Sequence, residues 1–162
     1  WVLPPLMFDE DELEALLLGM RWVAQRTDPA LEKSARSAID KIDAVLPSDL
    51  RHVFEQSALL VAPSHRESGA ALDLSLVRTA IRERRRVELS YRDAKAQASQ
   101  RVVWPVALGF FESTRILAGW CELREDFRHF RLDRVESWKA LGQRYPGSRS
   151  SLFERWKATL RI

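Results

Sequence analysis

The hydrophobic period of the sequence changes once, near residue 85, and this change limits the folds that the chain can adopt. Before it, apolar residues recur every three or four positions, as on one face of a helix. After it, apolar positions alternate with polar ones, as in a half-buried strand: Val87, Leu89 and Tyr91 against Glu88, Ser90 and Arg92. The pattern predicts an α+β chain, with a helical first part and a sheet in the second.

Two long helices are expected in the first part. Asp9 and Glu12 form a capping-box pattern, and helical spacing of the apolar residues then predicts a helix over 10–26. Asp28 and Pro29 are a second start signal, and this helix should end at Pro47. A short helix over 48–56 and a strand over 58–62 are also expected. The breaker-rich stretch 63–69 then separates this helical segment, 1–62, from the rest.

The second part should begin with a helix capped by Asp73 or Ser75 and running to about residue 84. Its buried residues should be Leu76, Val77, Ala80 and Ile81. Five short strands are predicted at 87–92, 100–111, 115–122, 127–133 and 135–140, with Pro105 bending the second or placing it at an edge. Short strands with tight turns favour a small closed barrel, here over 73–141.

The tail, 142–162, is predicted to end in a helix. Ser151 and Glu154 form a capping-box pattern there. One side of this helix should carry Leu152, Phe153, Trp156 and Leu160.

Charge is divided unevenly between the two parts. Residues 1–75 hold 7 basic and 13 acidic residues, a net charge of −6, whereas residues 76–162 hold 19 and 10, a net charge of +9. This asymmetry indicates two modules with different partners, and the basic part is a candidate for binding anions, with nucleic acid first among them.

Catalytic and metal-binding patterns are not found in the sequence. His52, His65 and His129 lie in different predicted elements without a second ligand at usable spacing, and Cys121 has no cysteine partner. We therefore expect no metal, no cofactor and no enzymatic activity. The single cysteine favours a reducing compartment, the cytoplasm, and no apolar run approaches the length of a membrane span.

Arginine dominates the predicted strands, and lysine is absent from 96 to 138. A guanidinium pairs bidentately with phosphate or carboxylate, so these arginines could bind an anion. They could equally form a solvated basic face with ion pairs to nearby carboxylates. A tyrosine beside them, Tyr91, could offer a ring for stacking, or it could be a core residue.

The stretch 76–135 resembles the WYL domain of bacterial transcription regulators. One matching block is Arg101-Val102-Val103-Trp104-Pro105. The two most specific blocks are Leu117-Ala118-Gly119-Trp120-Cys121-Glu122-Leu123-Arg124 and Phe130-Arg131-Leu132-Asp133-Arg134-Val135. The family's Trp-Tyr-Leu signature falls on Arg115-Ile116-Leu117, so Ile116 supplies neither the ring nor the hydroxyl of the family's tyrosine.

The resemblance implies an Sm-like, SH3-type barrel with a basic pocket for an anionic effector, a nucleotide or single-stranded nucleic acid. The pocket residues that it assigns are Tyr91, Arg101, Arg124, Arg128 and Arg131, and strand alternation adds His129. It also implies a dimeric regulator whose winged helix-turn-helix head binds promoter DNA. Because Trp1 begins the chain without a methionine, we expect that head to precede it in a longer protein.

Two other functions compete with an effector-sensing domain. Small barrels with basic faces also bind RNA or single-stranded DNA directly. A purely structural dimerisation domain would use its arginines only for ion pairs. Effector sensing and direct nucleic-acid binding differ in where the arginines lie. In the first they converge on a pocket, and in the second they line an open groove.

Overall fold

The computed structural model describes residues 7–47, 50, 61, 72–111 and 114–160. The chain forms two compact units, Trp1–His65 and Arg66–Ile162. No helix among the described residues combines the length and the apolar character needed to cross a membrane.

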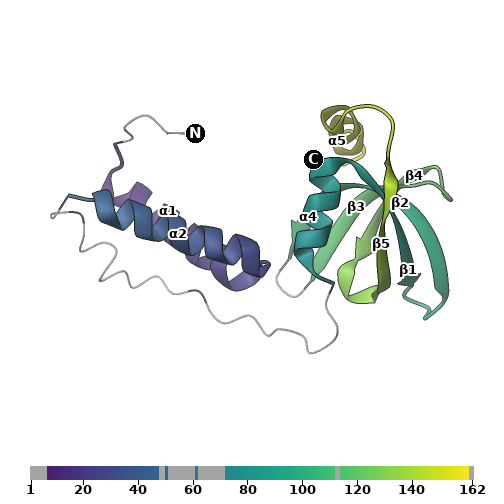
Figure 1. The fold of residues 1–162 in the computed structure, drawn as a ribbon, viewed down its shortest axis with the longest axis horizontal. Coiled ribbons are helices and arrows are strands. Elements are labelled where there is room, and N and C mark those ends of the chain that lie inside the picture. The colour runs from purple at the N-terminus through teal and green to yellow at the C-terminus, as the bar shows by residue number, and fades with distance from the viewer. Residues whose placement is uncertain (1–6, 48–49, 51–60, 62–71, 112–113, 161–162) are drawn as a thin grey trace. The chain divides into compact units, whose positions relative to one another are not determined.

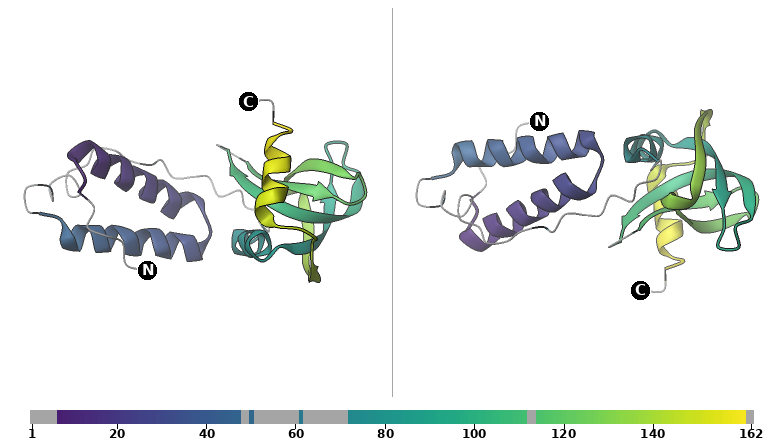
Figure 2. Two further views of the ribbon diagram at one scale, coloured as in Figure 1. Left: turned by 90° about the horizontal axis from the view of Figure 1, so that it is seen from above. Right: turned by 90° about the horizontal axis from the view of Figure 1, so that it is seen from below.

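The first unit contains two long helices, α1 (Glu10–Arg26) and α2 (Pro29–Val45), which lie side by side (Figure 2). The predicted capping box is confirmed, because Asp9 Oδ1 accepts from Glu12 N at 2.9 Å and Glu12 Oε2 accepts from Asp9 N at 3.0 Å. Asp28 caps α2 by accepting from Leu31 N at 3.1 Å. The helix, strand and boundary predicted over 48–69 lie outside the described residues, apart from Leu50 and Val61.

The second unit opens with α4 (Leu74–Glu83), capped by Asp73. Val77 and Ala80 are buried as predicted and Ile81 packs against the core, but the prediction for Leu76 is wrong. This side chain is 49% exposed, because it lies on the side of the helix that faces away from the sheet.

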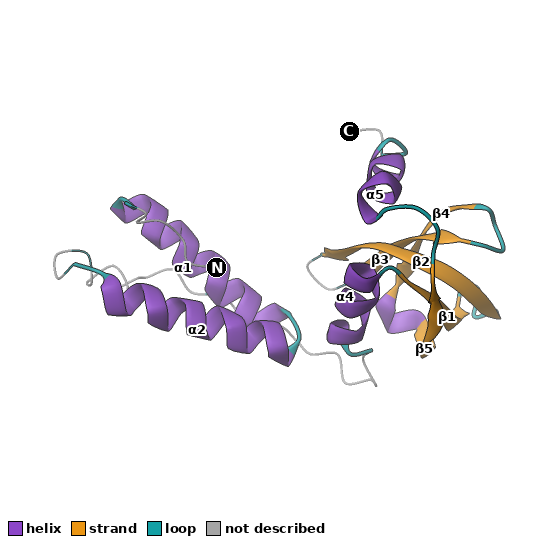
Figure 3. Cartoon of the chain, turned by 45° about the horizontal axis from the view of Figure 1, so that its top comes forward, coloured by secondary structure: helices purple, strands orange, loops and turns teal. Residues whose placement is uncertain are grey.

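Five antiparallel strands form one sheet in the order β4-β3-β2-β1-β5. They are β1 (Arg85–Arg92), β2 (Ala98–Phe110), β3 (Arg115–Cys121), β4 (Asp126–Arg131) and β5 (Val135–Arg144) (Figures 1 and 3). The expected closed barrel is not found, since β4 and β5 are edge strands without a ladder between them in the described part of the chain. The 3₁₀ turn η1 (Leu132–Arg134) takes the chain from one edge to the other instead.

The bounds of β1, β2, β3 and β4 differ from the sequence-based prediction by one or two residues, and the largest difference lies in β5. Leu132 and Asp133 belong to η1 rather than to β4, and β5 runs four residues beyond 140.

The bend predicted at Pro105 in β2 is confirmed. The β2–β3 register shifts between Pro105 and Ala107, and the β1–β2 ladder ends at Val103, so proline leaves no ladder bond unmade on that side.

The sheet has two hydrophobic clusters. One contains Leu89, Val103, Leu117 and Phe130, and α4 packs on it through Val77. The other contains Val106, Tyr145 and Leu152, with Trp104, Trp120 and Trp156 packed around them. Helix α5 (Arg149–Lys157) contributes Leu152 and Trp156 to this second cluster and lies across the sheet (Figure 2).

The predicted start of α5 is wrong by three residues. Ser148 is the cap, because its Oγ accepts from Ser151 N at 3.0 Å. Ser151 therefore lies inside the helix. The helix ends at Lys157, which leaves Leu160 beyond it, and Phe153 contacts Trp156 with ring centroids 5.5 Å apart.

Candidate functional site

Strand register places a set of polar side chains on the face of the sheet that also carries the first hydrophobic cluster. Arg101 pairs with Leu89 and Phe130 pairs with Leu117, so these residues share a face with the buried leucines. Tyr91 follows Leu89 by two positions and lies on that face as well. The face therefore changes from apolar to polar along β1, β2 and β4.

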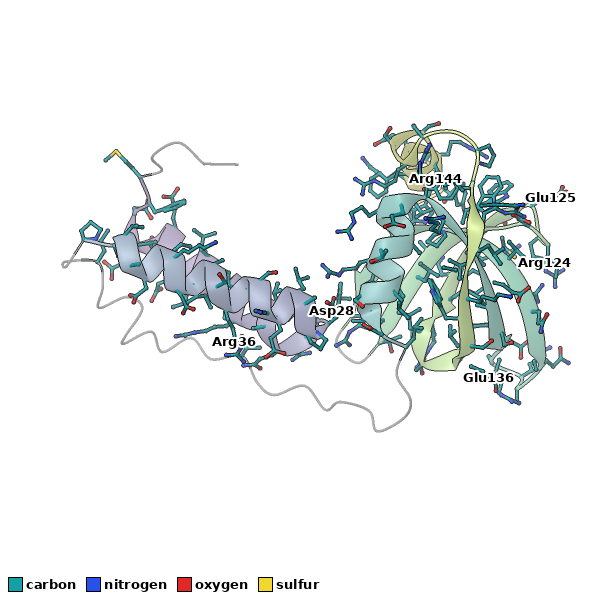
Figure 4. The ribbon with its side chains drawn as sticks, in the orientation of Figure 1. Asp28, Arg36, Arg124, Glu125, Glu136 and Arg144 are labelled. Atoms are coloured by element: carbon teal, nitrogen blue, oxygen red, sulfur yellow. The ribbon has the colours of Figure 1, made fainter. Side chains whose placement is uncertain are left out.

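A pocket of about 270 Å³ lies at the polar end of this face. Its lining residues are Tyr91, Asp93, Ser99, Arg101, Cys121, Arg124, Arg128, His129 and Phe130. Five of the six residues predicted as ligand-binding are among them, and Arg131 is the exception. Arg124 belongs to the turn between β3 and β4, next to Glu125 (Figure 4).

Arg101 is the least exposed of the three arginines in this pocket. Its Nε donates to Ser99 Oγ at 3.2 Å. Its Nη1 is buried and has no hydrogen-bond partner among the described residues. A buried donor on a charged group costs free energy when it is unpaired, so this atom marks a place where an acceptor would be stabilising.

Arg124 and Arg128 are exposed at the mouth of the pocket. Arg128 pairs with Asp126 at 3.2 Å, and both side chains are 54% exposed, so this ion pair is solvated and weak. Arg124 forms no salt bridge with the described residues. Both guanidinium groups are therefore available to a bound anion at little cost.

Tyr91 joins the pocket to the hydrophobic cluster. Its ring meets that of Phe130 edge to face, with centroids 5.2 Å apart. Its hydroxyl accepts from Arg131 N at 3.4 Å and therefore keeps its own proton for a further acceptor.

His129 contacts helix α5 as well as lining the pocket. Its Nε2 accepts from Trp156 Nε1 at 3.3 Å, so the neutral ring carries its proton on Nδ1. Strand alternation places its side chain on the face opposite Phe130, as expected from the sequence.

The structure does not bring the Arg131 side chain into the pocket. Its guanidinium forms a two-point ion pair with Asp133, at 3.1 Å from Nε to Oδ1 and 2.8 Å from Nη2 to Oδ2. This pairing lowers the pKa of Asp133. Arg131 contributes to the site through its backbone N–H, which holds the Tyr91 hydroxyl. Its short distance to Asp133 along the chain is the signal that favours an ion pair.

Four lining residues were missed from the sequence: Asp93, Ser99, Cys121 and Phe130. Ser99 follows from the β1–β2 register, in which it pairs with Tyr91. Cys121 pairs with Val103 and forms part of the pocket wall as a buried free thiol. Asp93 sits in the loop between two strands, and alternation gives no information about such a position.

The position of the family signature lies outside the pocket. Ile116 pairs with Gly109 and Arg131 and is not a lining residue. Leu117 is fully buried, and the Arg115 guanidinium lies 5.6 Å from the centroid of the Phe110 ring. The loss of the aromatic pair at 115–116 therefore removes no side chain from this pocket.

No group of three or more potential ligands within the described ranges is placed to hold a metal ion. The pocket combines guanidinium and hydroxyl donors with aromatic rings and the carboxylate of Asp93.

Comparison with known proteins gives a family match within the second unit. Residues 73–140 match the family model of the WYL domain. Among solved structures, the chain is similar to proteasome accessory factor B/C (PafBC) of Arthrobacter aurescens, with 27% sequence identity and a TM-score of 0.44. The match covers 91% of this chain but 23% of that protein, so the chain spans less than a quarter of its length.

Proposed function

We propose that the second unit is the effector-sensing domain of a bacterial transcription regulator and binds an anion in the arginine-lined pocket. The effector is a nucleotide or a single-stranded nucleic acid. Its binding modulates promoter binding by a winged helix-turn-helix that lies outside this chain. The WYL match over 73–140 supports a regulatory domain, and the pocket supports the choice of an anion.

One observation carries the proposal. Arg101 has a buried, unpaired Nη1 in a pocket that also holds Arg124 and Arg128, and neither Arg101 nor Arg124 forms a salt bridge with the described residues. Guanidinium groups held together repel one another, and an unpaired buried donor costs about 1–3 kcal/mol. A bound phosphate would remove both penalties.

The size of the pocket limits what it can hold. Small-molecule sites span roughly 300–1,000 Å³, and this pocket of about 270 Å³ lies just below that range. It suits one nucleotide, either free or as one unit of a strand. Arg101, Arg124 and Arg128 line the same pocket, and we take this as support for effector sensing over direct RNA binding.

A structural domain without a ligand is the main competing function. Arg128 and Arg131 do form ion pairs with Asp126 and Asp133, as that function requires. Arg101 and Arg124 do not form such ion pairs with the described residues.

We also propose a homodimer, because the helices of the first unit leave apolar side chains such as Leu16 and Val45 exposed, at 37% and 79%. Sedimentation as a monomer at high micromolar concentration would rule this out.

We propose further that the pocket binds without catalysing a reaction. Its buried Cys121 lies against the hydrophobic cluster, where a thiol acts as a small apolar residue.

Calorimetric titration with adenosine 5′-monophosphate tests the proposal. The unmodified chain should bind it, and the double variant Arg124→Ala/Arg128→Ala should bind at least tenfold more weakly, because two charge-assisted contacts are lost. Arg144→Ala removes a charge from β5, outside the pocket (Figure 4), and should leave the affinity nearly unchanged. If Arg144→Ala weakened nucleotide binding as much as Arg124→Ala/Arg128→Ala does, only the net charge of the chain would matter. That result would refute the pocket as the binding site.

A further inference from the structure

The arginine-lined pocket contains one carboxylate, that of Asp93. The residue directly follows β1 and begins the loop to β2. A carboxylate is unfavourable in a site that binds only a bare anion, because it repels the ligand that the arginines attract. Its presence therefore needs an explanation.

One of the two carboxylate oxygens of Asp93 accepts hydrogen bonds from the loop between β1 and β2. Asp93 Oδ1 accepts from Lys95 N at 2.8 Å and from Gln97 N at 3.0 Å. The loop is closed further by Asp93 N, which donates to Gln97 O at 3.1 Å, and by the left-handed conformation of Ala96, with φ of 59°. No hydrogen bond from the described residues reaches Oδ2. One oxygen fixes the loop, and the other is free to contact a ligand.

The carboxylate is also held in its charged form. The backbone N–H of Gln97 lowers the pKa of Asp93, and the N–H of Lys95 and the charges of Lys95 and Arg134 act in the same direction against burial. Asp93 forms no salt bridge with Arg101, Arg124 or Arg128. The pocket therefore presents a fixed acceptor beside its three cationic donors.

We propose that Asp93 determines the specificity of the pocket, by accepting a hydrogen bond from a hydroxyl or N–H group of the bound anion. This inference rests on the proposed function and narrows its ligand. The ligand carries an anionic group for the arginines and, on the same molecule, a donor for Asp93 Oδ2. A nucleotide meets both demands through its phosphate and through a sugar hydroxyl or a base N–H, whereas inorganic sulfate, which carries no proton at neutral pH, meets only the first.

The variant Asp93→Asn tests this directly. The asparagine Oδ1 can keep both loop hydrogen bonds, while its NH₂ group replaces the acceptor by a donor. Titration with adenosine 5′-monophosphate should show affinity reduced about tenfold or more, the usual effect of losing a hydrogen bond to a charged group. Titration with inorganic sulfate should show tighter binding, because a repelling charge has gone. The two ligands respond in opposite directions.

Two further variants serve as controls for the folding and for the charge of Asp93→Asn. Asp93→Ser can also accept from the loop N–H groups and should weaken nucleotide binding in the same way, even if the asparagine variant folds poorly. Glu88→Gln removes a charge from the opposite face of β1 and should change neither affinity appreciably.

The outcomes separate this inference from the proposed function. If both ligands bind Asp93→Asn more tightly, Asp93 acts only as a distant charge, and the inference fails while the pocket stands. If the unmodified chain binds neither ligand, the proposed function fails and the inference with it. Two analogues identify the donor: loss of affinity confined to 2′,3′-dideoxyadenosine 5′-monophosphate assigns it to the sugar, and loss confined to ribose 5-phosphate assigns it to the base.

Discussion

Glu122 shows how single residues hold the sheet in the shape that the pocket requires. Arg86 donates to both of its oxygens, at 2.7 and 2.8 Å, and Trp104 Nε1 donates to Oε1 at 2.6 Å. Arg86 also contacts Gln143 on β5. The cluster thus links β1 and the residue that follows β3 with β2 and β5, and none of its members lines the pocket.

Glu122→Gln should lower the free energy of unfolding by about 1–2 kcal/mol at pH 7, because two donors lose a charged acceptor that is only partly exposed. Burial opposes ionisation of Glu122, but the hydrogen bonds from Arg86 and Trp104 outweigh it and lower its pKa. This contribution is complete above the unfolded-state pKa, roughly 4.3, and is lost as the pH falls through the lower folded-state pKa. Denaturant unfolding at pH 7 and below pH 4 should show the difference from the unmodified chain shrinking on acidification.

The exposed pair of Arg92 and Glu136 provides the control, since both side chains are more than 40% exposed. Glu136→Gln should cost no more than a surface ion pair, about 0–1 kcal/mol. A Glu122→Gln variant as stable at pH 7 as Glu136→Gln would show that the cluster is not a structural link.

Gly119 permits the close approach of β3 to β2. A Cβ added there would lie 2.4 Å from Val103 Cγ1 and 2.9 Å from the carbonyl oxygen of Trp104, which belongs to the backbone and cannot move aside. Gly119→Ala should therefore destabilise the second unit by about 1–3 kcal/mol. At Gly142 nothing lies within 4 Å of such an atom, so Gly142→Ala should remain within about 0.5 kcal/mol in the same unfolding experiment. Equal stability of the two variants would contradict this packing.

Five of the six residues that the sequence predicts as ligand-binding line the pocket. Alternation along the strands accounts for Tyr91, Arg101 and Arg128, which share a face once the register is right. It fails for Arg131, whose guanidinium finds a carboxylate two residues away in η1, a turn that breaks the alternation. It fails for Asp93 because the position of a loop residue depends on the hydrogen bonds that close the loop.

Elements with a strong local signal are predicted well, and elements that depend on tertiary contacts are not. Helices α1 and α2 begin at the predicted caps. The last four residues of β5 carry little hydrophobic alternation, and pairing with β1, including Arg85 with Arg144, determines them instead. The path of the chain from β4 to β5 likewise depends on η1, which no sequence period indicates.

The stability of variants at the start of α5 tests whether Ser148 is its N-cap. Ser148→Ala removes the acceptor for Ser151 N and should destabilise the unit by about 1 kcal/mol. Ser151→Ala should have little effect, because the exposed Ser151 side chain caps nothing. Thermal unfolding of both variants decides between the two positions, and the reverse order of stability would restore Ser151 as the cap.

At the scale of the whole molecule, charge is segregated between an acidic helical part and a basic sheet, with net charges of −6 over residues 1–75 and +9 over 76–162. Such segregation steers anions toward the sheet, and the arginine-lined pocket gives them a defined place to bind. We propose that the pocket arginines, rather than the overall positive charge, hold the ligand.

The salt dependence of oligothymidylate binding tests that claim most directly. Each phosphate neutralised on a single strand contributes about −0.7 to the slope of log affinity against log salt concentration. Arg124→Ala/Arg128→Ala should weaken binding and flatten this slope by roughly one unit or slightly more, while Arg144→Ala should leave it nearly unchanged. If the double variant bound with the slope and affinity of the unmodified chain, these arginines would be surface residues, and the sheet would be a structural domain.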